Sequence, residues 1–192
     1  QYSVHLIADE IAVGFGRTGT MFACEQADVH PDFICLSKGI TGGYLPLSAV
    51  LTRDEIYQAF YHDKVTKAFL HSHSYTGNPL ACSAALATLN IFETEDILQK
   101  NHVKSDFIWQ HMQAFSDLPI QYLRRKGMIF AIDVVSSNIN FPRDCYAEAI
   151  KQGLLIRPIG NSVYLMPPYT INQDEILHAL QAISRSVSKA LI

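Results

Sequence analysis

Short apolar runs separated by polar stretches dominate the first half of the chain. We expect strands at residues 4–9, 33–37 and 47–52, because each run has the length of a strand and polar or turn residues follow it. The first run begins almost at Gln1 and is mostly apolar, as in a parallel strand that is buried on both faces. Such a strand needs neighbours and crossover helices. We therefore expect this chain to be a piece of a longer protein whose amino-terminal part precedes it.

Two helices are predicted after these strands. Residues 53–62 favour a short helix with Thr52 as its N-cap and Glu55 at its third position. Residues 80–93 are rich in alanine and leucine and contain no glycine or proline. We expect them to form a long buried helix with Pro79 in its first turn.

The pattern changes near residue 95. Residues 96–115 carry apolar side chains near helical spacing, and residues 128–135 then favour a strand. Residues 145–152 predict a helix that ends at Gly153, since glycine suits the left-handed conformation that closes many helices.

The last part of the chain predicts a hairpin and a helix. We expect residues 154–157 and 162–166 to be two strands that turn at Gly160. Residues 173–191 are amphipathic and follow Asn172, a good N-cap residue, so they should form the final helix.

Strands and helices alternate in the first half and no longer do so in the second. We therefore expect an α/β fold in residues 1–95 and a small α+β domain in residues 96–192. A chain of 192 residues with 48% hydrophobic and 17% charged residues can bury a sizeable core.

Charge and cysteine content exclude several classes of protein. The 15 basic and 18 acidic side chains give a net charge of −3 without a basic block, which argues against a nucleic-acid partner. No stretch approaches the roughly 20 apolar residues that span a membrane. The four cysteines are scattered and form no CxxC pair, so we expect neither a zinc site nor a disulfide framework, and a cytoplasmic location.

An acid and a lysine lie at the ends of two predicted strands. Asp9 closes the first strand and Lys38 follows the second. If these strands are neighbours, both side chains lie at one edge of the sheet. A lysine can form a Schiff base with the aldehyde of pyridoxal phosphate, and a carboxylate can keep the pyridine nitrogen of that cofactor protonated. The pair therefore predicts a pyridoxal phosphate site.

Two other motifs carry weaker predictions. The sequence GFGRTG at residues 14–19 matches the dinucleotide-binding fingerprint, but its glycines neither follow the strand directly nor open a clear helix. The acids Asp9 and Glu10 before it would also repel a phosphate. His71 and His73 could pair on a metal ion, but no third ligand stands at suitable spacing, so we expect no metal site.

Two further features have open alternatives. Hydroxyl side chains precede Gly77-Asn78-Pro79, where they could bind a phosphate or simply cap a helix. Arg157 stands in an apolar run, and a buried guanidinium needs a carboxylate or a ligand anion as its partner. An arginine on an edge strand that faces water explains the same pattern.

Four segments together resemble the class III aminotransferases of fold-type I in order and spacing: Asp9-Glu10-Ile11, GFGRTG at 14–19, Ser37-Lys38-Gly39 and Gly77-Asn78-Pro79. The resemblance runs the length of the chain and covers the carboxyl-terminal half of such an enzyme. Within the class, four stretches resemble the members that act in biotin synthesis: residues 36–47, 69–82, 155–158 and 164–169.

The resemblance implies a cofactor site that two subunits share. Asp9 would pair with the pyridine nitrogen, and Lys38 would hold the cofactor and move a proton between cofactor and substrate. Ser74 would reach the cofactor phosphate of the other subunit, so we expect a homodimer. The family's amino-terminal half carries the ring-stacking aromatic residue and further phosphate-binding groups, so this chain alone lacks part of the site.

The resemblance also implies a substrate pocket for small molecules. Arg157 would bind the carboxylate of an oxo acid, Tyr164 would line the same pocket, and Arg17 and Gly43 would lie near the substrate. The expected donor is S-adenosylmethionine and the expected acceptor is 8-amino-7-oxononanoate, which becomes 7,8-diaminononanoate. Another class III transaminase with an ω-amine or ornithine-like donor, and a fragment that binds no cofactor, are the alternatives.

Overall fold

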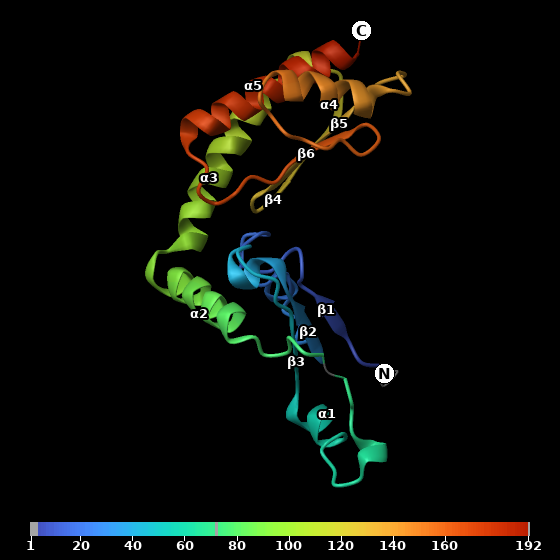
Figure 1. The fold of residues 1–192 in the computed structure, drawn as a ribbon. Coiled ribbons are helices and arrows are strands. Elements are labelled where there is room, and N and C mark those ends of the chain that lie inside the picture. The colour runs from blue at the N-terminus through green and yellow to red at the C-terminus, as the bar shows by residue number, and fades with distance from the viewer. Residues whose placement is uncertain (1–3, 72, 192) are drawn as a thin grey trace. The chain divides into compact units, whose positions relative to one another are not determined.

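The computed structural model describes residues 4–71 and 73–191 (Figure 1). The chain divides into two compact units, Gln1–Ile97 and Leu98–Ile192. The first unit contains a three-stranded sheet in the order β1-β2-β3, with strands Ile7–Asp9, Phe33–Leu36 and Ala49–Thr52. Strands β1 and β2 are parallel, whereas β2 and β3 are antiparallel. The three predicted strand positions are therefore confirmed, although the strands are shorter than the apolar runs.

Short helices connect the strands of this unit, and one long helix follows them. These are η1 (Ala23–Ala27), η2 (Lys38–Thr41), α1 (Asp54–Gln58), η3 (Val65–Lys67) and α2 (Pro79–Thr94). The predicted start of α2 at Pro79 is confirmed. The side-chain oxygen of Asn78 caps the helix by accepting a hydrogen bond from the Leu80 N–H at 2.9 Å.

The predicted N-cap of α1 is wrong. Arg53 occupies that position and makes no side-chain cap, while Thr52 remains the last residue of β3. The Thr52 hydroxyl donates a hydrogen bond to the Asp32 carbonyl oxygen at 2.9 Å. Because this hydroxyl is engaged with Asp32, Thr52 stays in β3 and the N-cap of α1 lies one residue later, at Arg53.

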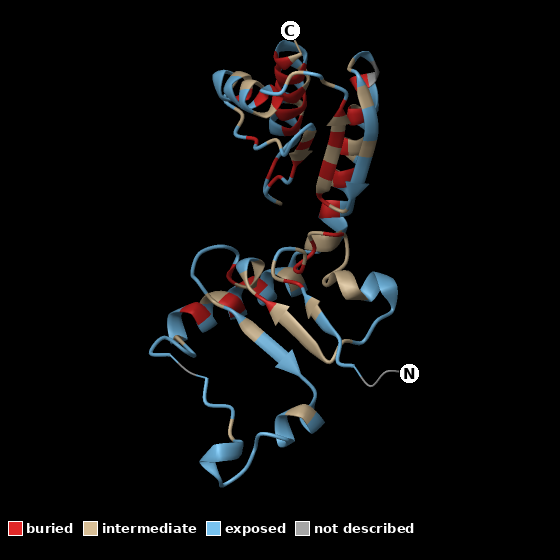
Figure 2. Cartoon of the chain, turned by 90° about the vertical axis from the view of Figure 1, so that its right-hand side faces the viewer, coloured by how far each residue is buried: buried red, intermediate tan, exposed pale blue. Residues whose placement is uncertain are grey.

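The first unit is less buried than its sequence predicted. Ile7 of β1 is 62% exposed, and Leu80 and Leu86 of α2 are exposed as well (Figure 2). The buried side of α2 is confined to Ala81, Ala85 and Thr88, the small residues of one helix face. The contacts of the described residues leave these apolar faces of β1 and α2 uncovered, and the burial expected of both elements within a longer protein stays a prediction.

The second unit packs helices against an antiparallel sheet. Its elements are α3 (Ile97–Met112), η4 (Gln113–Asp117), β4 (Ile120–Lys126), β5 (Ile129–Val134), α4 (Phe141–Lys151), β6 (Ser162–Leu165) and α5 (Gln173–Ala190). The strand order is β4-β5-β6, and both pairings are antiparallel. The sequence did not predict β4, an edge strand with three basic residues.

The predicted hairpin of the second unit is only half correct. The turn at Gly160 is present, because the Ser162 N–H donates to the Ile159 carbonyl at 3.0 Å, and β6 follows it. Residues 154–157 are not a strand. The Leu154 N–H instead donates to the Ala149 carbonyl at 3.0 Å, which closes helix α4. Strand β6 therefore pairs with β5 rather than with the preceding segment.

The core of the second unit is apolar and continuous. Alternate residues of β5 turn inward, and Phe130 and Ile132 are buried there together with Phe141 of α4 and Ile183 of α5. Burial raises the pKa of the Cys145 thiol in this core to about 11. Each buried large side chain of this kind contributes roughly 1.5–3 kcal/mol to folding.

The predicted N-cap of the last helix is confirmed. The Asn172 side chain accepts a hydrogen bond from the Glu175 N–H, and the Glu175 carboxylate accepts one from the Asn172 N–H, both at 2.9 Å. None of the helices within residues 4–71 and 73–191 is long and apolar enough to cross a bilayer.

Candidate active site

The carboxyl ends of β1 and β2 bring an acid and a lysine to one edge of the first sheet. The parallel register pairs Ile7 with Phe33 and Asp9 with Cys35. Beyond this pair, the Glu10 N–H donates to the Cys35 carbonyl at 3.0 Å, so the pairing extends past Asp9. Lys38 follows the end of β2 by two residues, and both Asp9 and Lys38 are exposed. The sheet therefore has the neighbouring parallel strands that the sequence predicted.

The Asp9 carboxylate is oriented by its own turn. Its Oδ1 accepts a hydrogen bond from the Ile11 N–H at 3.1 Å, where the strand gives way to a series of turns. The side chain of Asp9 is exposed, so its carboxylate stays accessible. This arrangement fits the sequence-predicted role of Asp9, which itself stays a prediction.

Glu10, by contrast, points into the unit and is only 2% exposed. Its carboxylate accepts hydrogen bonds from the Ala23 N–H at 2.9 Å and from the Cys24 N–H at 2.8 Å, at the start of η1. Burial and the nearby Glu10 carboxylate both raise the pKa of the Cys24 thiol. Glu10 thus closes the segment between β1 and η1 into a loop. Sequence reasoning identified Glu10 only as part of a motif and missed this bracing role.

The segment between β1 and η1 consists of turns and does not open a helix. The glycines at residues 14–19 lie within it, and Gly16 and Gly19 adopt positive φ angles of 87° and 108°. The first helical element after them is the five-residue η1. This geometry lacks the strand–glycine–helix sequence that a dinucleotide site requires, as the sequence analysis expected.

Lys38 has an unusual backbone conformation. Its φ angle is 46°, in the left-handed region that side-chain-bearing residues rarely adopt. It opens the short helix η2, which ends at Gly42 with a φ of 62°. Strained backbone of this kind persists only where the surrounding structure enforces it, and it is concentrated at functional sites.

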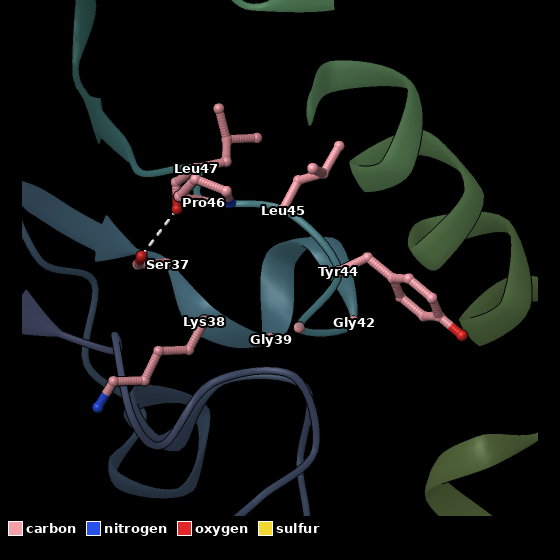
Figure 3. Close-up of a pocket in the computed structure, with 9 residues that line it drawn as sticks. Ser37, Lys38, Gly39, Gly42, Tyr44, Leu45, Pro46 and Leu47 are labelled. Carbon is pink, nitrogen blue, oxygen red and sulfur yellow. Dashed lines mark hydrogen bonds between the residues drawn. The ribbon is translucent and has the colours of Figure 1, made fainter. Parts of the chain in front are cut away.

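A hollow of about 590 Å³ lies beside Lys38, and its lining is Ser37, Lys38, Gly39, Gly42, Gly43, Tyr44, Leu45, Pro46 and Leu47. Figure 3 shows Lys38 and Tyr44 pointing away from each other across η2. Two hydroxyl groups fix the segment from Leu45 to Leu47, which lines one side of the hollow. The Ser37 hydroxyl donates to the Leu47 carbonyl at 2.7 Å, and the buried Thr41 hydroxyl donates to the Leu45 carbonyl at 2.6 Å.

The sequence analysis singled out Lys38 and Gly43 from this lining and missed the two hydroxyl braces. The signal that could have found them is a pair of hydroxyl residues, Ser37 and Thr41, that flanks the lysine on both sides. Gly43 has a φ of 85° and open space where a side chain would stand, so a small molecule can approach its backbone.

The remaining candidates of the first unit lie in different settings. Arg17 is half-buried within the turns that follow β1. Ser74 is exposed in a turn just before α2, where the Thr76 N–H donates to the His73 carbonyl at 3.0 Å and the Asn78 N–H to the Tyr75 carbonyl at 3.2 Å. This turn presents Ser74 to the outside of its own unit.

Two candidates belong to the second unit. Tyr164 is half-buried on β6, opposite Ala131 of β5. Arg157 is exposed and stands in the irregular segment before β6 rather than on a strand. Of the two alternatives left open for Arg157, its exposure agrees with the second, an arginine that faces water, although it does not stand on a strand. The substrate-binding roles of both residues stay predictions.

The residues at the sheet edge fit what pyridoxal phosphate requires. The cofactor needs a primary amine for its aldehyde and a carboxylate for its pyridine nitrogen, and Lys38 and Asp9 supply these groups from adjacent strand ends. The hollow beside Lys38 is lined by residues between 37 and 47, and Asp9 is not among its lining residues. This fold with this pair of side chains is the arrangement that the class of PLP-dependent aminotransferases requires, and the roles of the two side chains stay predictions.

Comparison with known proteins agrees with this geometry. Residues 1–187 match the family described as "Aminotransferase class-III", so the chain belongs to the class III aminotransferases. It is 51% identical over 190 residues to the adenosylmethionine-8-amino-7-oxononanoate aminotransferase of Helicobacter pylori, covering 95% of this chain and 44% of that protein. The chain thus spans less than half of the length of this relative.

Solved structures confirm the predicted fold-type I class. The adenosylmethionine-8-amino-7-oxononanoate aminotransferase of Methanocaldococcus jannaschii superimposes with a TM-score of 0.91 at 37% identity, over 98% of this chain and 47% of that one. A PLP-bound amine transaminase from an uncultivated Pseudomonas species gives a TM-score of 0.85 at 34% identity, over 97% and 45%. Class III aminotransferases depend on pyridoxal phosphate (PLP), which agrees with the cofactor predicted from Asp9 and Lys38.

The buried carboxylate of Glu10 leads to a stability prediction. Glu10→Ala leaves the Ala23 and Cys24 N–H groups without their acceptor, so it should lower the free energy of unfolding by about 2 kcal/mol or more. Glu10→Gln keeps one acceptor oxygen and should lose less. Thermal unfolding of the full-length protein measures both. The matched control is Glu25→Ala, which removes one exposed contact to the Phe22 N–H and should cost under about 1 kcal/mol. Equal losses for Glu10→Ala and Glu25→Ala would contradict the bracing role.

Proposed function

We propose that this chain is the lysine-bearing part of a PLP-dependent aminotransferase of biotin synthesis. The full-length enzyme would transfer the amino group of S-adenosylmethionine to 8-amino-7-oxononanoate and so form 7,8-diaminononanoate. The observation that carries the proposal is the placement of Asp9 and Lys38 at the carboxyl ends of two parallel strands. The 51% identity to the Helicobacter pylori enzyme supports the choice of substrates.

Each of the two side chains has a distinct task in this reaction. When bound, pyridoxal phosphate supplies an electron sink that makes the C–H bond beside the substrate's amino group acidic. Lys38 would hold the cofactor through its Nζ, and the same atom would accept and return a proton during the reaction. The Asp9 carboxylate would favour a proton on the pyridine nitrogen, since an anion close to a cation stabilises the charged form.

A second candidate is a transaminase of the same class that takes a simple amine as its donor. The amine transaminase from the uncultivated Pseudomonas species supports this alternative, because its 34% identity and TM-score of 0.85 come close to those of the Methanocaldococcus jannaschii enzyme. The fold is common to both, so the donor must be tested directly.

A homodimer with shared active sites is part of the proposal. The connection between β3 and α2, residues 53–78, extends away from the sheet of its unit, and we call this excursion the β3–α2 segment (Figure 1). The β3–α2 segment carries aromatic side chains in the open: Tyr57 stacks on Tyr61 at 5.7 Å, and Phe60 meets Phe69 edge-on at 5.8 Å. Exposed apolar patches of this kind are typical of protein–protein contacts. Ser74 lies at the end of the same β3–α2 segment.

A reducing cytoplasm is the proposed location. The cysteines Cys24, Cys35, Cys82 and Cys145 are all free thiols, which is the usual state of cysteines in a reducing compartment.

The identity of the cofactor lysine and of the donor can be tested together. Borohydride reduction of the full-length enzyme should fix a pyridoxyl group on Lys38, and peptide mapping should find it there. Prior incubation with S-adenosylmethionine should abolish this labelling, because amino transfer frees the lysine, whereas an ω-amine should leave it intact. A Lys38→Arg variant is the control that should not be labelled. Label on Lys64 or Lys67, or loss of label with the ω-amine only, would overturn the assignment.

The sharing of active sites between subunits can be tested by complementation. A Lys38→Ala subunit and a Ser74→Asp subunit should each be inactive as homodimers, because the second introduces a negative charge beside a phosphate. Random exchange of equal amounts makes about half of the dimers mixed, each with one whole site, so about a quarter of the parental activity should return. A mixture of Lys38→Ala and Lys38→Arg subunits is the control and should stay inactive. No recovery after demonstrated exchange would place Ser74 outside the neighbour's site.

The proposed role of Arg157 predicts different effects on the two half-reactions. Loss of a bidentate contact to a carboxylate should cost about 2–4 kcal/mol, or tens- to hundreds-fold in affinity. Arg157→Ala should therefore weaken the reaction with 8-amino-7-oxononanoate by this factor and leave the reaction with S-adenosylmethionine largely unchanged. Stopped-flow absorbance measures each half-reaction separately. Arg143→Ala, which removes another exposed arginine of the second unit, should change neither. Equal damage to both half-reactions by Arg157→Ala would refute selective recognition of the oxo acid.

A further inference from the structure

Phe15 lies directly behind the backbone that carries Lys38. A Cβ atom placed on Gly39 would stand 3.0 Å from both Cβ and Cδ2 of Phe15 and 3.2 Å from its Cγ. These distances are shorter than ordinary van der Waals contacts between carbon atoms, which lie near 3.5–4.0 Å. Because Gly39 itself does not adopt a positive φ, glycine is required there by the space that Phe15 occupies and not by the backbone conformation.

Phe15 is held firmly in this place. It is 4% exposed, and its ring meets Phe22 edge-on at 5.8 Å and Phe92 of α2 at 6.4 Å. Its own φ is 57°, so Phe15 also adopts the left-handed conformation that a bulky residue avoids. The burial of the Phe15 ring against Phe22 and Phe92 offsets the cost of this backbone conformation.

Phe15 packs against Gly39, the residue that follows Lys38. Both Phe15 and Lys38 therefore adopt left-handed conformations close to this contact. Each such residue costs of order 1–3 kcal/mol and is kept only where neighbouring groups block its relaxation. The Phe15 ring blocks movement of the Lys38–Gly39 backbone toward the turns that follow β1. The direction of the Lys38 Cα–Cβ bond is fixed by the same backbone.

We infer that Phe15 is a positioning residue, which holds the Lys38 backbone in its left-handed conformation by packing on Gly39 and so aims the lysine amine at the cofactor aldehyde. This inference rests on the proposed role of Lys38 as the cofactor-binding lysine. It also assigns a purpose to the GFGRTG motif, whose glycines at 14 and 16 allow the tight turns on either side of Phe15.

The test uses Gly39→Ala, Phe15→Ala and the double variant in the full-length enzyme. The first readout is the rate at which the apo-enzyme captures added pyridoxal phosphate covalently, followed by absorbance and by borohydride trapping on Lys38. Small displacements of a reacting group can lower rates by up to 10²-fold, so Gly39→Ala should slow capture by about tenfold or more. The double variant should recover at least half of this loss in the logarithm of the capture rate, because the added Cβ at position 39 no longer meets the Phe15 ring.

A second readout separates positioning from general loss of stability. Phe15→Ala should shift the pH midpoint of the absorbance of the lysine-bound cofactor, which loosening elsewhere would not move. If Phe15→Ala does not yield folded protein, Phe15→Leu takes its place, because leucine keeps most of the buried volume. Gly160→Ala is the matched control: its φ is 54° and its Cβ would meet nothing within 4 Å. It should lower stability slightly and leave capture and pH midpoint at the parental values.

The outcomes distinguish this inference from the proposed function. If borohydride does not trap the cofactor on Lys38 of the parental enzyme, the proposed function is overturned. Thermal unfolding of the apo variants would still measure the contact between Phe15 and Gly39. Parental trapping together with a parental rate in Gly39→Ala would overturn the inference. Strictly additive effects of the two substitutions, or an unmoved pH midpoint in Phe15→Ala, would overturn it as well.

Discussion

The parallel pairing of β1 with β2 is the interaction on which the rest of the site depends. Asp9 and Lys38 are distant in sequence, and the in-register pairing that ends with Asp9 opposite Cys35 sets the two strand ends side by side. A register shift of one residue would turn every side chain of β1 to the opposite face of the sheet. The Asp9 carboxylate would then point to the opposite face of the sheet, although no residue of the site had changed.

Different forces organise the two units. Directional hydrogen bonds fix the loops at the sheet edge of the first unit: the Glu10 carboxylate closes the segment after β1, and the Ser37 and Thr41 hydroxyls hold the wall of the hollow. The second unit relies on an apolar core around Phe130 and Phe141. Hydrophobic burial is not directional, whereas hydrogen bonds prescribe distances and angles. Polar bracing therefore suits the unit that carries the candidate site.

Backbone strain in the described residues is concentrated near the candidate site. Four residues other than glycine have positive φ angles, and two of them, Asp28 and Asp96, are of a type that tolerates this conformation. The other two are Phe15 and Lys38, which have no such tolerance and lie on the two sides of Gly39. Local signals do not explain these two conformations, so the packing around them must.

The sequence by itself determined the features that depend on near neighbours: the starts of α2 and α5, which Asn78 and Asn172 cap, and the acid and lysine that mark the cofactor class. Only the tertiary structure decided features that depend on distant partners. Strand β4 escaped prediction because its charged residues pair with β5 alone, at a sheet edge. Residues 154–157 form no strand, and the Leu154 N–H donates instead to the Ala149 carbonyl at the end of α4. The packing of Phe15 on Gly39 joins residues of two loops, and no local pattern encodes a contact that forms only when the sheet has brought those loops together.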